Sequence, residues 1–177
     1  RAAHQQLNEI YGQVQSAQAY LDQGQPDAAA ATLAAVDAPT STPTMPAAAP
    51  GDYFTAVNQY VMHFAAANTL PCQVQIDPGL TPVDLAPVER LQAARILQEA
   101  LENVRKHAHA QQVEVRFERG EDGILLVVQD DGVGFDPAQV TGAGIESIHS
   151  RALAVGARMT VDAQPGGGTR LCIHFPA

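Results

Sequence analysis

Two segments of this 177-residue chain combine residue types that suit nucleotide chemistry, and the first is QDDGVGFD at residues 129–136. It follows the apolar run ILLVV, so Asp130 stands where an expected strand ends and its carboxylate can accept a hydrogen bond from an exocyclic amine. Gly132 and Gly134 permit positive φ angles and a close approach of the backbone to a ligand. An ordinary turn after a strand explains the same residues, so the segment alone is only a candidate site.

The second segment is a polar stripe on the longest expected helix, residues 85–108. Glu99, Asn103 and Lys106 recur at i, i+4 and i+7, away from the apolar stripe of the same helix. A carboxylate can orient or deprotonate a nucleophile, an amide oxygen suits a hard cation, and an ammonium pairs with phosphate. A solvated face with an incidental Glu–Asn–Lys ladder is the simpler interpretation of the stripe by itself.

Two glycine-rich segments complete the set of candidates. Gly142 and Gly144 stand at the start of the segment 142–156, just before the helix expected within it, whose free N–H groups and positive dipole end suit an anionic phosphate. PGGGT, which ends at Thr169, is typical of a hairpin turn and as such needs no function. Each segment is weak evidence on its own.

The hydrophobic periodicity predicts the elements that position these residues. We expect helices over 52–68, 85–108 and 142–156, and strands over 72–77, 113–119 and 124–130, with two more strands between 157 and 176. The strands expected over 113–119 and 124–130 flank a hairpin turn at 120–123. This order predicts an α+β fold, a two-layer α/β sandwich with a mixed sheet and helices on one face.

A different pattern occupies the first 51 residues. Leu7, Tyr11, Val14 and Leu21 recur at the a/d spacing of an associating helix, and an Ala-rich short helix is expected over 27–36. Four prolines then fall within residues 37–51, which is typical of a linker. We therefore expect a helical dimerisation segment (1–36), a proline-rich linker (37–51) and a globular domain (52–177), assembled as a homodimer.

Composition excludes several functional classes. Ten basic residues against nineteen acidic ones give a formal net charge of −9, which argues against direct nucleic-acid binding. No run of about 18 apolar residues predicts a membrane span, and the two cysteines lack metal-type or redox-type spacing. Because the chain begins at Arg1, we expect a cytoplasmic fragment of a longer protein, with membrane attachment only through upstream segments.

Together, LQEALENVRKHA, DDGVGF, GAGIESIHSRA and PGGGTRL occur in an order that resembles the ATP-binding domain of two-component sensor histidine kinases. The residues of these motifs are most similar to those of the subgroup of nitrate and membrane-fluidity sensors, and the resemblance covers about residues 52–176. It implies a Bergerat-type nucleotide fold, ATP as the nucleotide and Mg²⁺ as its cation. A GxxxxGK[ST] phosphate loop is absent from the sequence.

The resemblance also implies a role for each candidate residue. Asn103 corresponds to the magnesium ligand, Glu99 to the catalytic Glu upstream of it, and Asp130 to the adenine-reading Asp. The remaining residues implied in nucleotide binding are Lys106, His107, Gly132, Gly134, Gly142, Gly144 and Thr169.

His4 resembles the phosphoacceptor of the family more loosely, because Gln5 stands where an acidic residue usually follows the His. The implied function is ATP-dependent autophosphorylation of His4, followed by phosphotransfer to an aspartate of a response regulator. Alternatively, His4 is a surface residue of a dimer helix, and the protein is a non-catalytic ATP-binding scaffold that signals by dimer rearrangement. A further alternative with the same nucleotide fold is a serine kinase that acts on an anti-sigma antagonist. Such kinases lack a helical dimerisation segment before the nucleotide domain, which disfavours this alternative.

Overall fold

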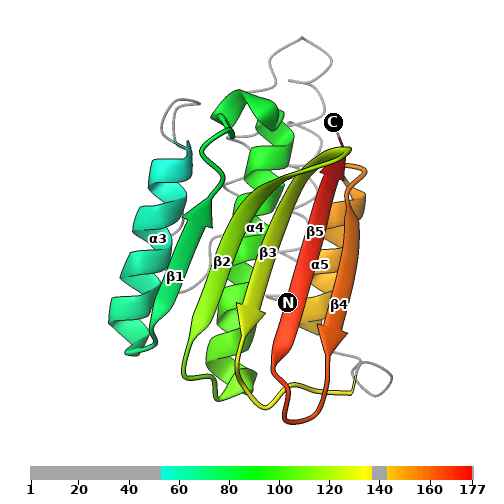
Figure 1. The fold of residues 1–177 in the computed structure, drawn as a ribbon. Helices are drawn as coiled ribbons and strands as arrows, with labels where there is room; N and C mark the ends of the chain where they lie inside the picture. The colour runs from blue at the N-terminus through cyan, green and yellow to red at the C-terminus, as the bar shows by residue number, and fades with distance from the viewer. Residues whose placement is uncertain (1–52, 137–142, 177) are drawn as a thin grey trace, which may run out of the picture. The chain divides into compact units, whose positions relative to one another are not determined.

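The computed structural model describes residues 53–136 and 143–176, and within them three α-helices lie on one face of a five-stranded sheet (Figure 1). The elements are α3 (Tyr53–Asn68), β1 (Cys72–Ile76), α4 (Pro87–Asn103), β2 (Val113–Gly120), β3 (Gly123–Asp130), α5 (Ala143–Leu153), β4 (Arg158–Ala163) and β5 (Thr169–Pro176). The predicted dimerisation segment with His4, the linker and Gly142 lie outside the described residues.

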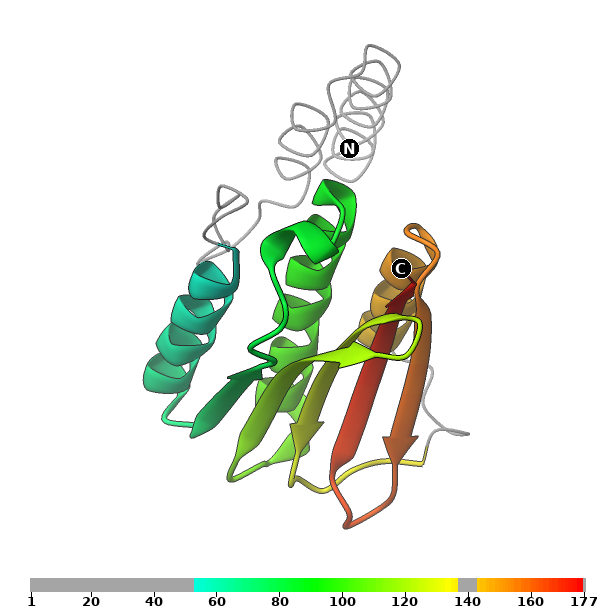
Figure 2. The same cartoon turned by 45° about the horizontal axis from the view of Figure 1, so that its top comes forward.

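The sheet has the strand order β1-β2-β3-β5-β4. β1 runs parallel to β2, and every other neighbouring pair is antiparallel, so the sheet is mixed as predicted. The predicted hairpin is confirmed, since Gly120 pairs with Gly123 across the turn. Figure 2 shows all three helices on the same side of the sheet, which confirms the α+β sandwich.

Strand alternation separates the two faces of the sheet. In β2, Val113, Val115 and Phe117 are fully buried against the helices. Between them, Arg116 on the open face forms ion pairs with Glu114 at 3.0 Å and with Glu118 at 2.9 Å. None of the helices in the described ranges has the length and apolar character that a membrane crossing requires.

α4 differs from the predicted helix at both ends. It begins at Pro87 rather than Leu85, because proline suits the first helical position and the Glu89 carboxylate accepts the Ala86 N–H at 2.6 Å. Its α-helical part ends at Asn103, and Val104–Ala108 continues as a π-helix that His109 terminates with φ of +50°. We call Val104–Ala108 the π turn.

Candidate functional site

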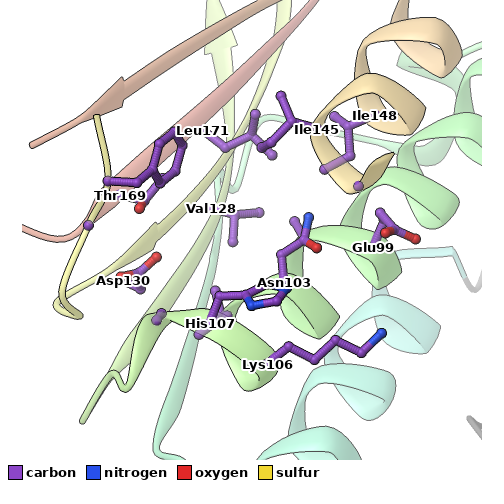
Figure 3. A pocket seen from close by; sticks show the side chains of 16 residues that line it. Glu99, Asn103, Lys106, His107, Val128, Asp130, Ile145, Ile148, Thr169 and Leu171 are labelled. Carbon is purple, nitrogen blue, oxygen red and sulfur yellow. The ribbon is translucent and has the colours of Figure 1, made fainter. Parts of the chain in front are cut away.

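A cavity of about 610 Å³ lies between α4, α5, β3 and β5, and its size is in the range of small-molecule sites (Figure 3). Two groups of side chains face each other across it. The sheet wall consists of Val128, Asp130, Thr169 and Leu171, and the helix wall consists of Glu99, Asn103, Lys106 and His107. The structure thus brings together predicted residues that lie up to 70 positions apart in the sequence.

Asp130 is the charged residue of the sheet wall. It ends β3, is only 7% exposed, and accepts a hydrogen bond from the Gly132 N–H at 2.8 Å. Burial raises the pKa of its carboxyl, while the Gly132 and Thr169 N–H groups partly oppose this by stabilising the charged form. Because a carboxylate offers several acceptor sites, Asp130 at the cavity edge can accept a further hydrogen bond from a ligand amine.

Gly132 and Gly134 are required by close backbone approaches. A Cβ at Gly132 would overlap the carbonyl oxygen of Ala108, which belongs to the π turn. Gly134 has φ of +59°, and its Cβ would overlap the Gln164 carbonyl oxygen and lie 2.6 Å from that of Gly168. Gly134 lines the cavity, whereas Gly132 packs behind it. The two glycines therefore allow the DDGVG segment to pack closely between the π turn and the β4–β5 turn.

Asn103 and Glu99 are one turn apart on α4 and both line the cavity. Gly144, in the first turn of α5, approaches the Asn103 side chain so closely that a Cβ there would lie 2.5 Å from Oδ1. The missing side chain at Gly144 therefore leaves room for the Asn103 amide between α4 and α5. This close approach joins two motifs that are about forty residues apart in the sequence.

The π turn determines where the next two predicted residues lie. Because a π-helix holds more residues per turn than an α-helix, the α-helical spacing that linked Lys106 to Asn103 in the sequence does not continue beyond Asn103. His107 lies between Asn103 and Asp130 in Figure 3, and Lys106 extends away from Asp130. The Lys106 ammonium pairs with Glu102 at 3.1 Å rather than with Glu99. Arg105 and Lys106 together lower the pKa of Glu102 to about 2.

Sequence reasoning missed the apolar part of the cavity and the role of the PGGGT turn. Val128 and Leu171 are direct cross-strand partners two residues from Asp130 and Thr169, so strand alternation could have placed them on the same wall. Ile145 and Ile148 of α5 add apolar surface that suits a flat aromatic base. Gly168 has φ of +75°, and a Cβ there would overlap the Asp130 carbonyl oxygen. That turn therefore supports the site.

A sequence family described as "Histidine kinase-, DNA gyrase B-, and HSP90-like ATPase" matches residues 89–177, half of the chain. The match begins in α4 and includes both walls of the cavity. The chain belongs to this ATPase family. The membership confirms the predicted ATP-binding domain and ATP as its nucleotide, whereas the finer subgroup of nitrate and fluidity sensors stays a prediction.

Several curated proteins similar to this chain are named as sensor proteins or histidine kinases. An "Uncharacterized sensor-like histidine kinase" of Chloroflexus aurantiacus is 42% identical over 46% of this chain and 15% of its own length. "Sensor protein VraS" of Staphylococcus epidermidis is 36% identical over 46% of this chain and 24% of its own length. "Signal transduction histidine-protein kinase/phosphatase UhpB" of Salmonella typhimurium is 31% identical over 57% and 20%. The chain thus spans less than a quarter of each relative.

Solved structures show the same fold. The histidine kinase domain of the blue-light activated histidine kinase of Erythrobacter litoralis matches with a TM-score of 0.58, at 16% identity, over 97% of this chain and 91% of that domain. The Acinetobacter baumannii histidine kinase AdeS matches with a TM-score of 0.57, at 16% identity, over 70% and 62%. The likeness confirms the sandwich architecture of the ATPase domain.

The donors around the cavity fit a magnesium ion that arrives with a nucleotide. The described residues hold no cluster of three His, Cys, Asp or Glu side chains that could bind a metal on its own. Mg²⁺ with a nucleotide usually takes one or two protein oxygens and completes its shell with phosphate oxygens and water. The Asn103 Oδ1 at the cavity wall, kept accessible by Gly144, is suited to be such a ligand.

Proposed function

We propose that this chain is the catalytic portion of a sensor histidine kinase that phosphorylates His4 from ATP and passes the phosphoryl group to a response-regulator aspartate. The observation that carries the proposal is the pairing of two different walls across one cavity. A buried carboxylate, Asp130, occupies the sheet wall, and Glu99 and Asn103 occupy the opposite wall. This separation suits a ligand with an amine-bearing base at one end and phosphates at the other.

Each wall would have a distinct task in the reaction. Asp130 would accept a hydrogen bond from the exocyclic amine of adenine, and Val128, Leu171 and Ile148 would pack against the base. Asn103 would hold Mg²⁺, which neutralises charge on the phosphates, and the first-turn N–H groups of α5 would face the same phosphates. Such an arrangement would fix the nucleotide with its γ-phosphate toward the helix wall.

The chemical step would be an in-line displacement at the γ-phosphorus. An imidazole nitrogen of His4 forms the new N–P bond, the bond from phosphorus to the β,γ-bridging oxygen breaks, and ADP leaves. Glu99 would orient the imidazole and take the proton from its other ring nitrogen, the one that does not attack phosphorus. The helical segment would dimerise so that His4 is presented to the nucleotide domain of either subunit, and transfer to the regulator would then restore the free imidazole.

The test is labelling of the full chain with γ-labelled ATP and Mg²⁺. We expect label that is stable in base and lost in acid, and that disappears in His4→Gln. His63→Gln is the matched control, since His63 is an exposed helical histidine on α3 outside the cavity, and it should keep the label. Nucleotide binding without label, even in Gln5→Glu, would contradict the kinase proposal and support the non-catalytic scaffold.

A further inference from the structure

Asp131 lies next to Asp130, which lines the cavity, but is itself exposed and does not line it. Its Oδ1 accepts hydrogen bonds from two backbone N–H groups, that of Gln111 at 2.7 Å and that of Gln112 at 2.9 Å. These N–H groups lie between His109, which ends the π turn, and the start of β2. One carboxylate at the end of β3 therefore holds the chain segment that leaves the helix wall.

Further backbone contacts join the same two regions. The Val133 N–H donates to the Ala108 carbonyl, the last residue of the π turn, at 2.7 Å. The Val133 carbonyl accepts the Gly166 N–H at 2.6 Å on its other side. Residues 131–133 thus connect the π turn with the β4–β5 turn, and Asp131 supplies the side-chain part of that connection.

The π turn is the part of the helix wall on which such an anchor would act. π-helical turns are rare, insert an extra residue into a helix, and are often found at functional sites. Relaxation of the turn to α-helical geometry would rotate the side chains within it around the helix axis, each by less than the about 100° that separates successive α-helical residues. His107 and Lys106 both lie within the turn, so its geometry decides whether His107 faces the cavity.

We infer that Asp131 is a positioning residue of the nucleotide site, whose carboxylate fastens the exit of the π turn and thereby holds His107 on the cavity wall. The inference rests on the proposed function, because it assigns a role within the same site. The two N–H groups lower the pKa of the Asp131 carboxyl, so the acceptor is charged at neutral pH. Gln111 and Gln112 are exposed, so water can replace the lost acceptor and the fold survives its removal.

The experiment compares Asp131→Ala, which removes the acceptor, with Asp131→Asn, which keeps an acceptor oxygen without the charge. Binding of Mg²⁺·ATP is measured by calorimetry well below the unfolding midpoint of every variant. We expect affinity to fall about 3- to 20-fold in Asp131→Ala, the size of one or two lost hydrogen bonds, and to stay within about 3-fold of the original chain in Asp131→Asn. Asp162→Ala, at an exposed site on β4, is the matched control and should not change affinity.

A double-mutant cycle tests the route through His107. In a His107→Ala background, Asp131→Ala should lose most of its effect, because the residue that it positions is already absent. Full additivity of the two substitutions would overturn the inference, as would equal affinities for the original chain and Asp131→Ala. Equal losses in Asp131→Ala and Asp131→Asn would also overturn it, since charge and not the hydrogen bonds would then be responsible.

A measurement without nucleotide separates this inference from the proposed function. The imidazole NMR signals of His107 in the free protein should shift in Asp131→Ala and stay near their original positions in Asp131→Asn. If the original chain binds no ATP, the proposed function fails, and these signals still decide the role of Asp131. Unchanged His107 signals in Asp131→Ala would overturn that role.

Discussion

The two walls of the cavity are built in different ways. In the sheet wall, Val128 pairs with Leu171 and Asp130 pairs with Thr169 directly across the antiparallel β3–β5 ladder. The helix wall instead passes from the α-helical residues Glu99 and Asn103 into the π turn that carries Lys106 and His107. A strand ladder fixes its side chains through many cooperative contacts, whereas the π turn depends on a few contacts beyond its own end.

This difference matches what each wall would recognise under the proposed function. The base of a nucleotide is rigid and flat, so a wall with a fixed carboxylate and fixed apolar partners can read it. Phosphates and their cation carry charge that is redistributed during transfer, and the charged and polar side chains of the helix wall suit such groups. We therefore expect substitutions in the sheet wall to affect folding or base binding, and substitutions in the helix wall to affect cation and phosphate binding.

The largest effect is expected where the sheet wall meets its supporting turn. Gly134→Ala must adopt φ of +59° and also overlap the backbone oxygen of Gln164, the first residue after β4. The left-handed conformation and the overlap together should lower the free energy of unfolding by about 2 to 5 kcal/mol. Gly156→Ala is the control, because its φ is +70° but no atom lies within 4 Å of the added Cβ. Denaturant unfolding measures the change. Equal losses of unfolding free energy in Gly134→Ala and Gly156→Ala would show that the close backbone approach at Gly134 does not matter.

The next effect concerns base recognition in the sheet wall. Asp130→Asn keeps the size of the side chain but presents an amide to the adenine amine, so nucleotide affinity should fall by about 1 to 3 kcal/mol. Calorimetric titration with ATP measures the loss, and Asp162→Asn on β4 is the matched control. Unchanged affinity in Asp130→Asn would remove Asp130 from the base site.

The same substitution should not destabilise the protein without nucleotide. Burial raises the pKa of the Asp130 carboxyl, so the stability that its protonated form contributes is fully present below the usual Asp pKa. That contribution is lost as the pH rises through the raised pKa, and the carboxylate is a cost at neutral pH. Asp130→Asn should therefore not lower the unfolding midpoint at pH 7, whereas a purely structural role would lower it.

The sheet wall was largely predictable from the sequence. The run ILLVVQD predicts a buried strand that ends at Asp130, and the glycines that follow indicate a tight backbone approach. Even here, the need for Gly168 was not predictable. The PGGGT turn reaches Asp130 only because β5 pairs with β3, and this pairing spans about forty residues.

The helix wall was predicted in composition but not in geometry. VRKHA looks like ordinary helix, and no residue in it breaks the pattern, so the sequence predicts α-helix to Ala108. The π turn is instead associated with long-range contacts of Ala108 with Val133 and of Asp131 with Gln111 and Gln112. Local periodicity contains no information about such contacts.

A smaller effect is expected at the cation ligand of the helix wall. Asn103→Ala should weaken binding of Mg²⁺·ATP by about 1 to 2 kcal/mol, because the ion loses a protein oxygen. Binding of ATP in the presence of EDTA should change little. Gln98→Ala, which removes an amide from the same helix outside the cavity, serves as the control. An equal loss with and without Mg²⁺ would show that Asn103 does not act through the cation.

The smallest effect is expected at Lys106, a charged and half-exposed side chain of the helix wall. Lys106 and Arg105 both pair with Glu102, and their side chains are 50% and 43% exposed, but only Lys106 lines the cavity. Exposed ion pairs contribute little, so neither Lys106→Met nor Arg105→Met should change the free energy of unfolding by more than about 1 kcal/mol. If the ammonium leaves Glu102 for a phosphate, Lys106→Met alone should weaken ATP binding, by about 1 kcal/mol or less at low salt and less still at high salt. Titrations at two ionic strengths measure this, and equal losses in the two variants would show that Glu102, rather than phosphate, is the functional partner of Lys106.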